Sequence, residues 1–199
     1  YGDINLTQSF KIHAFTITEK SEIGWFYCSG SATEIDRYVI YNYEDNVWYY
    51  GQLERHAWLD SGIENYPRAT YNGYLFEQED GFNNDGSPMT NVFIESSDFE
   101  VGEGEQFAYI QRMFPDLKFL SNSEAGTVNL VIKTRNNPGE SLSTSSTSSV
   151  GSSTGQVSLR ARSRQAVFRV ESDDDSDGND NVGWRLGATR LDIKPDGRR

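Results

Sequence analysis

The side chains in this sequence that are able to do chemistry are mostly carboxylates, and one short run of them has the spacing of a metal-binding loop. The run DDDSDG at 173–178 places carboxylates at loop positions 1, 3 and 5 and glycine at position 6, as a calcium-binding EF-hand loop does. Position 12 is Trp184 instead of a bidentate glutamate, and strand-like sequence flanks the run. We therefore interpret the acidic segment 173–181 as a hairpin tip, with calcium binding left open.

The other candidate catalytic groups lack the neighbouring residues that their reactions require. A catalytic triad requires a histidine beside a nucleophile and an orienting carboxylate, and no nucleophile-elbow pattern surrounds Ser29 or Ser61. Two acidic pairs have the composition of glycosidase carboxylates, but a chain with 30 acidic residues contains many such pairs. The sequence therefore predicts no catalytic residue, no cofactor and no metal ligand. The residues considered are His13, His56, Glu77, Glu79, Glu95 and Asp98.

Arginines occupy one face of an alternating segment near the C-terminus. Over 157–170 apolar residues alternate with basic ones, which is typical of a strand with one buried and one solvated face. A second alternating run covers 184–193, and we expect the two runs to form a hairpin around the acidic tip. The arginines are interpreted either as contacts to DNA phosphates or as partners of carboxylates in this chain or a neighbouring subunit. Arg160, Arg162 and Arg164 share this face, and Arg169 follows a change of phase at Ala166 and Val167.

Charge and composition limit the classes of function. The 199 residues carry 18 basic and 30 acidic side chains, a net charge of −12. Residues 1–155 account for −13 and residues 156–199 for +1, which argues against nucleic acid wrapping most of the surface. The single cysteine, Cys28, excludes an internal disulfide. No apolar run reaches the roughly 20 residues that span a bilayer, so we expect no membrane insertion.

The hydrophobic pattern predicts an all-β fold of antiparallel meanders, with propeller-like blades followed by a sandwich-like C-terminal sheet. Three apolar runs at 23–29, 36–43 and 47–53 are joined by short polar turns, as in one blade of a β-propeller. Farther along, the dipeptide Asn72-Gly73 separates two short apolar runs and is a strong hairpin signal. Many short strands with frequent turn residues therefore make up the chain.

Two regions are predicted, a propeller-like β-meander over 1–65 and a β-rich C-terminal region over 66–199. Within the second region, the tract 136–155 reads NNPGESLSTSSTSSVGSSTG. Such a tract buries too little apolar area to offset the entropy of ordering it, so we expect a flexible serine-rich loop. Since the chain begins at Tyr1 without a methionine, we also expect it to be a piece of a longer protein.

Tryptophans and tyrosines are the residues with the largest potential for packing or interfaces. We predict that Trp48, Trp58 and Trp184 pack the sheets or lie in subunit contacts. The same kinds of ring stack on sugars, which supports the alternative of a carbohydrate- or receptor-binding β-module in a virion or secreted protein. The candidate sugar-stacking rings are Tyr41, Tyr43, Trp48 and Trp58.

Several segments of the chain resemble one family as an ensemble, although no single motif is specific. The family is the tail tube or nozzle group of short-tailed bacteriophages, also called packaged-DNA stabilisation proteins. The likeness spans most of residues 23–199, apart from the serine tract. The segments that carry it are 34–43 with Trp48 and Gly51, then 55–60, 73–79, 94–99 and 184–199.

The resemblance implies a structural protein of the virion tail, made in the host cytoplasm, and not an enzyme. It implies a homohexameric ring with a propeller-like body, whose central channel retains packaged double-stranded DNA and conducts it during ejection. Other tail proteins, such as an adaptor and a tail fibre or spike, would be its partners. We expect an acidic channel to repel phosphate, so that DNA slides without adhering. A glycoside hydrolase fragment is a further alternative.

Overall fold

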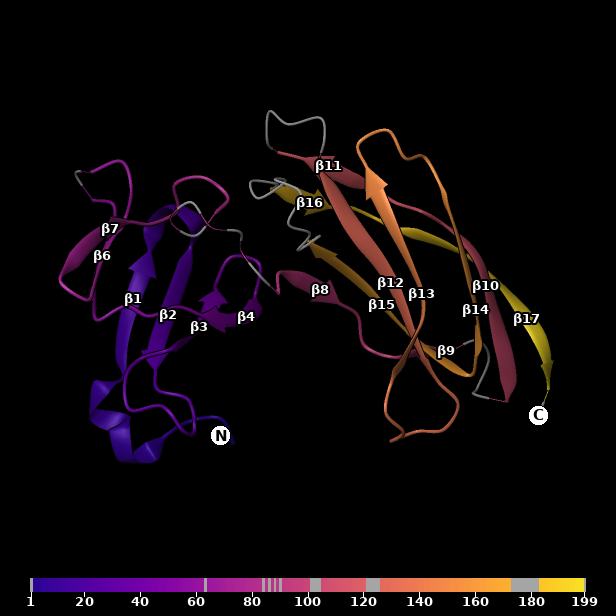
Figure 1. The fold of residues 1–199 in the computed structure, drawn as a ribbon, viewed down its shortest axis with the longest axis horizontal. Helices are drawn as coiled ribbons and strands as arrows, with labels where there is room; N and C mark the ends of the chain where they lie inside the picture. Colours follow the sequence, from indigo (N-terminus) through magenta and orange to yellow (C-terminus); the bar gives the residue numbers. More distant parts are fainter. Residues whose placement is uncertain are drawn as a thin grey trace. The chain divides into compact units, whose positions relative to one another are not determined.

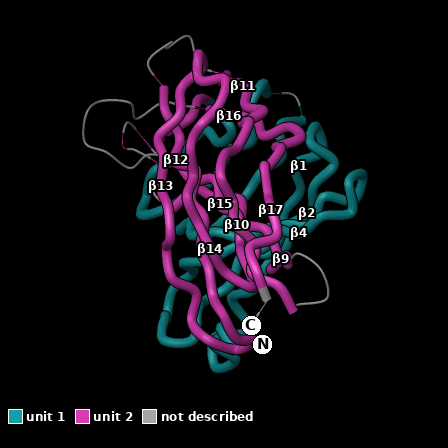
Figure 2. Tube along the Cα trace, turned by 90° about the vertical axis from the view of Figure 1, so that its right-hand side faces the viewer, with its two compact units in different colours: residues 1–80 teal, residues 81–199 magenta. Residues whose placement is uncertain are grey.

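The computed structural model is built from antiparallel β-sheets, which confirms the all-β class (Figure 1). It divides into two compact units, residues 1–80 and residues 81–199, coloured separately in Figure 2. The acidic segment 173–181 lies outside the described part of the chain. The structure describes residues 2–62, 64–83, 85, 87, 89, 91–100, 105–120, 126–172 and 183–198.

Unit 1 begins with the predicted meander, in which four strands pair in the order of the sequence. Each strand is antiparallel to the next, so the three apolar runs predicted as neighbours do lie side by side. The elements are η1 (Leu6–Lys11), β1 (His13–Ile17), η2 (Thr18–Lys20), β2 (Glu22–Tyr27), β3 (Arg37–Asn42) and β4 (Val47–Gln52).

A second, three-stranded sheet of unit 1 consists of β5 (Ala57–Leu59), β6 (Arg68–Tyr71) and β7 (Tyr74–Glu77). Asn72 and Gly73 turn the chain between β6 and β7 with φ of 48° and 81°, which confirms the predicted hairpin. Two positive φ angles are what a type I′ turn requires. The predicted boundary at residue 65 is wrong, because β5 pairs with β6 across it and the unit extends to Asp80.

The core of unit 1 lies on one face of the four-stranded sheet. Phe26 is fully buried and stacks on Phe15 with ring centroids 4.3 Å apart. The ring centroids of Trp58 and Phe15 are 4.8 Å apart, and Trp58 Nε1 donates a hydrogen bond of 2.9 Å to the Thr16 carbonyl. Gly24 lies under the Phe15 ring, where a Cβ would collide with it. Trp58 is therefore a packing residue that links β5 to the sheet.

Unit 2 contains a five-stranded sheet with β13-β12-β15-β8 in order and β9 also paired to β15. A three-stranded sheet has the order β14-β10-β17, and β11 pairs with β16. The strands are β8 (Phe93–Glu95), β9 (Phe99–Glu100), β10 (Gln106–Phe114), β11 (Leu117–Phe119), β12 (Thr127–Arg135), β13 (Ser143–Gly151), β14 (Val157–Ser163), β15 (Gln165–Ser172), β16 (Trp184–Leu186) and β17 (Arg190–Arg198).

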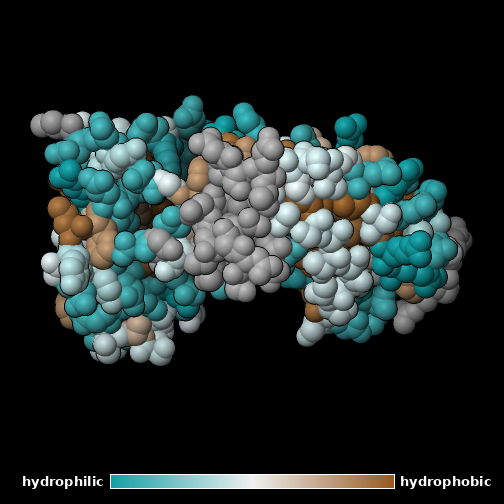
Figure 3. All heavy atoms as spheres, turned by 45° about the horizontal axis from the view of Figure 1, so that its top comes forward, coloured by the Kyte–Doolittle hydropathy of each residue, from teal (hydrophilic) through white to brown (hydrophobic). Residues whose placement is uncertain are grey.

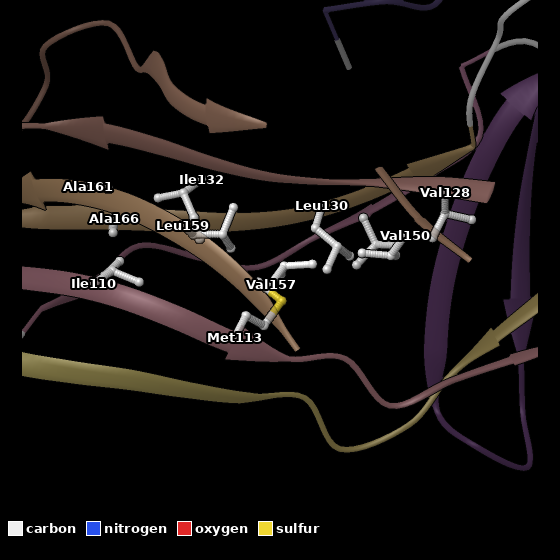
Figure 4. Packing of buried hydrophobic residues seen from close by; sticks show 11 residues of the cluster. Ile110, Met113, Val128, Leu130, Ile132, Val150, Val157, Leu159, Ala161 and Ala166 are labelled. Carbon is white, nitrogen blue, oxygen red and sulfur yellow. The ribbon is translucent and has the colours of Figure 1, made fainter. Parts of the chain in front are cut away.

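The two larger sheets of unit 2 enclose one apolar core, as in a β-sandwich. Along β14 the buried residues Val157, Leu159 and Ala161 alternate with exposed residues, as predicted from the sequence. Figure 4 shows these side chains in the space between strands of the two sheets. The cluster also contains Ile110, Met113, Val128, Leu130, Ile132, Val150, Ala166 and Val170.

The predicted serine-rich loop is wrong over 143–151, because these residues form β13. This strand pairs with β12 along most of its length, and its Val150 is buried in the core. Most of its other side chains are exposed. Hydrogen bonds to the backbone of the buried strand β12 order the tract, although its side chains bury little apolar area.

The predicted hairpin between 157–170 and 184–193 is also wrong. The first run divides near Arg164 into β14 and β15, which lie in different sheets. β15 pairs with β12, β8 and β9, whereas β17 pairs with β10. The division follows from the change in hydrophobic phase, since Ala166 and Val167 are both buried after the alternation of β14.

Replacing Leu159 with alanine will destabilise unit 2 by about 2–5 kcal/mol, because this fully buried side chain would leave a cavity between the sheets. Chemical denaturation followed by circular dichroism measures the change. The control is Ser158→Ala, an exposed position on the same strand that should change stability by about 0.5 kcal/mol or less. Equal effects of the two changes would contradict the inward direction of Leu159.

Candidate functional site

The outer face of the four-stranded sheet in unit 1 carries aromatic side chains where a solvated face would carry polar ones. The strand registers place Trp25 beside Val39 and Val39 beside Tyr50, and the next row contains Tyr41 beside Trp48. Side chains of directly paired residues point to the same side of a sheet. We call Trp25, Tyr41, Trp48 and Tyr50 the aromatic platform.

The rings of the aromatic platform contact one another but remain open to solvent. Tyr41 stacks on Trp48 at a centroid distance of 4.6 Å, and Trp25 lies 6.0 Å from Trp48. The Tyr41 hydroxyl donates a hydrogen bond of 2.8 Å to Asn46 Oδ1. Trp48 is 61% exposed and Tyr50 is 72% exposed. Figure 3 shows mostly hydrophilic residues on its visible surface, with apolar residues in small groups. Neighbouring exposed aromatic side chains such as these are typical of interaction sites.

Strand β4 adds an unprotected sheet edge to the aromatic platform. Within the described residues it pairs with β3 on one side only, and its sequence VWYYGQ has no charge and no proline. Edge strands normally carry charged residues or proline, because their unpaired backbone groups attract other strands. Edge strand β17 of unit 2 follows this rule, with Pro195 among alternating charged residues. β4 therefore has the composition of a strand that another chain or segment covers.

The opposite face of β4 is only partly covered, and Tyr49 on that face is 39% exposed. Burial raises the pKa of the Tyr49 phenol, and a hydrogen bond to the buried Glu22 raises it further. Gly51 lies against the Tyr38 ring, where a Cβ would collide with the ring. Tyr49 thus contacts Glu22 of β2, while β4 is held in the sheet by its pairing with β3.

The four arginines predicted to contact DNA or a subunit differ in their surroundings. Arg162 pairs with Asp196 and lies 4.1 Å from the centroid of Phe107. Arg160 is exposed on the same face of β14 and has no ion pair among the described residues. Arg164 follows β14 and is half-buried. A subunit or DNA contact by these arginines stays a prediction.

Arg169 belongs to a charged network on the five-stranded sheet. Its guanidinium contacts Glu171 and Glu95, and it lies 3.6 Å from the centroid of Phe93. Lys133 Nζ lies 2.6 Å from the same Glu95 carboxylate. These contacts match the interpretation of cross-strand pairing with carboxylates of this chain.

The residues considered for catalysis are held in structural contacts. Both acidic pairs are neutralised, since Glu77 and Glu79 contact Arg68 and Lys20, while Glu95 and Asp98 contact Lys133 and Arg135. In the described part of the chain no group of three or more His, Cys, Asp or Glu side chains is placed to hold a metal. Within those same residues no helix is long and apolar enough to cross a bilayer.

The remaining candidates, Trp184 and the two histidines, make packing contacts and are not part of the aromatic platform. Trp184 packs against the unit 2 core, and its Nε1 donates a hydrogen bond of 2.9 Å to Ser172 Oγ. His13 lies 5.2 Å from Phe26, and His56 lies edge-on to Tyr71. Trp25 and Tyr50 are residues of the aromatic platform that the sequence analysis does not identify, and Trp25 is the less obvious of the two. Its place on the aromatic platform depends on strand register, although the alternation within 23–29 shows which face of its strand it occupies.

Glu95→Gln will lower the thermal midpoint at neutral pH and change it little in acid. The hydrogen bond from Lys133, assisted by Arg169, lowers the pKa of Glu95. The stability that this carboxylate contributes is therefore complete above its ordinary pKa of about 4.3 and is lost as the pH falls through the lowered value. Thermal melts between pH 7 and pH 2 test this, with the exposed Glu105→Gln as control. A deficit that persists at the lowest pH would exclude the ionic cause.

The sequence matches no protein-family model, and no curated protein matches it in a sequence search.

Proposed function

We propose that the chain is a structural component of a short-tailed phage tail, part of a ring around a channel that retains packaged DNA and conducts it during ejection. The observation that carries the proposal is the uncovered aromatic platform with its unprotected edge strand β4. A sheet with this composition on its outer side is suited to permanent assembly. The resemblance of segments 34–43, 55–60 and 184–199 to tail tube proteins supplies the kind of assembly.

The charge of the molecule suits a channel through which DNA must pass. Unit 1 has 5 basic and 13 acidic residues, and unit 2 has 13 basic and 17 acidic residues. Both units are therefore net negative, at −8 and −4. A ring of such subunits repels phosphate along its wall, which prevents DNA from adhering while the ring encloses it. In a closed ring, each subunit also needs two different patches, one for each of its two neighbours.

Trp48→Ala and Tyr50→Lys will each weaken self-association of the purified chain by about tenfold or more. Large aromatic residues at interface centres contribute about 2 kcal/mol or more, and a charge on an edge strand disfavours pairing. Sedimentation velocity over a concentration series gives the dissociation constant, and electron microscopy shows whether the assemblies are rings.

Tyr74→Lys is the matched control, because Tyr74 is 69% exposed on β7, away from the aromatic platform. The variants should fold normally, since the replaced side chains are exposed. A wild-type chain that stays monomeric at high concentration, or platform variants that assemble as well as Tyr74→Lys, would contradict the proposal.

A second candidate function is binding of a neutral glycan on the aromatic platform. The exposed rings of Trp48 and Tyr50 are the observation in its favour, because sugar rings stack on indole and phenol faces. Trp58, which the sequence placed among the sugar-stacking rings, is instead packed against Phe15 in the core. Of the other sequence candidates, Tyr41 and Trp48 belong to the aromatic platform, and Tyr43 is 55% exposed directly after β3.

Glycan titration followed by tryptophan fluorescence separates the two functions. The structural proposal expects no saturable signal from a panel of neutral oligosaccharides, since the aromatic platform serves as a protein interface. Saturable binding by a monomeric chain that Trp48→Ala abolishes, and that Tyr74→Lys leaves intact, would favour the carbohydrate-binding module.

A further inference from the structure

The outer face of the three-stranded sheet in unit 2 is basic, although the unit as a whole is acidic. Strand registers, the alternating burial of β14 and the Arg162–Asp196 ion pair place five cations on the side opposite the core, with two carboxylates among them. The local balance is therefore +3 in a unit of net charge −4. The carboxylates are Asp192 and Asp196. We call this surface the basic face, and its cations are Arg112, Arg160, Arg162, Arg190 and Lys194.

Aromatic rings lie between these cations. The Arg162 guanidinium lies 4.1 Å from the Phe107 ring centroid, and that of Arg112 lies 5.6 Å from the Phe114 centroid. Tyr109 sits between them in the sheet, paired with Arg162 on one side and with β17 on the other. The basic face thus offers both positive charge and ring surface to a partner.

The ion pairs within the basic face are weak enough for its arginines to exchange partners. Arg112 pairs with Asp192 and Arg162 with Asp196, but both guanidiniums are about half exposed, at 46% and 50%. Exposed pairs of this kind contribute only about 0–1 kcal/mol. Arg160 and Arg190 are exposed and have no ion pair among the described residues. The carboxylates of a partner would therefore compete with only weak ion pairs for these arginines.

Unit 1 carries the complementary surface. Glu44 and Asp45 lie in the turn between β3 and β4, beside the Tyr41 and Trp48 end of the aromatic platform. Both are exposed, and neither forms an ion pair within the described residues, although Ser21 donates a hydrogen bond of 3.1 Å to Glu44. Aromatic surface next to unpaired acids in unit 1 matches aromatic surface among cations in unit 2.

We propose that the basic face of one copy docks on the aromatic platform and its flanking acids, Glu44 and Asp45, of a second copy. This inference rests on the proposed ring, for which it supplies the two different patches of a head-to-tail contact. Arginines stack on exposed indole and phenol rings as well as pairing with carboxylates, so both surfaces contribute to one interface. The opposite signs fix which surface meets which.

Two double variants and their mixture test the contact. Arg160→Glu with Arg190→Glu, and Glu44→Lys with Asp45→Lys, should each weaken self-association at least about tenfold at low salt, because like charges then face each other. Mixing the two variants restores opposite signs at every contact and should restore assembly. The control Lys118→Glu with Arg185→Glu makes the same charge change on β11 and β16 and should leave assembly unchanged. Sedimentation velocity measures all four samples.

The outcomes separate this inference from the proposed ring. If the wild type assembles and neither double variant weakens it, the ring stands and the contact is wrong. If the wild type does not associate at any concentration, both fail. If Arg160→Glu with Arg190→Glu leaves assembly intact but abolishes retention of duplex DNA in a gel shift, the basic face is a nucleic-acid surface, and the contact is again wrong. Weakening by both variants with recovery in the mixture supports the contact.

Discussion

A β-sheet that is apolar on both faces has to be covered on both, and this constraint governs unit 1. One face of the four-stranded sheet is covered within the unit by Trp58 and the strand that carries it. The other face exposes the aromatic platform, where an antiparallel sheet facing water would present polar residues. Since β4 is also an uncharged edge, the sheet lacks both usual defences against association. The same surface that would make a free monomer prone to aggregate makes a subunit suited to assembly.

The parts of the fold that were predictable are those with local signals. Asn72 and Gly73 form their hairpin because both adopt positive φ, a property visible in the dipeptide itself. The meander of unit 1 follows from short polar turns between apolar runs. β13 was not predictable in this way, because its order comes from pairing with the distant β12 and not from its own serines and threonines. Likewise, the division of β14 from β15 depends on which sheet each strand joins.

The candidate site was predictable only in part, since Tyr41 and Trp48 were sequence candidates and Trp25 and Tyr50 were not. The exposure of Trp48 and the alternation of Arg160 and Arg162 follow from composition and period-two spacing. Their neighbours do not, since Trp25 joins Trp48 only through the registers of β2, β3 and β4. The basic face is a still clearer case. It collects side chains from β14, β10 and β17, which are far apart in sequence and adjacent only in the sheet.

Aromatic and charged residues would contribute to assembly in different ways. Exposed ion pairs contribute about 0–1 kcal/mol each, whereas fully burying a large apolar side chain contributes about 1.5–3 kcal/mol. Covering Trp48 and Tyr50 would therefore supply most of the free energy of association, and the charges around them would select the orientation. This division suits a ring around a polyanion. In the proposed ring the contacts would persist in the salt that accompanies DNA, because burial of aromatic side chains is screened far less than charge attraction, while the net negative surface would still repel phosphate.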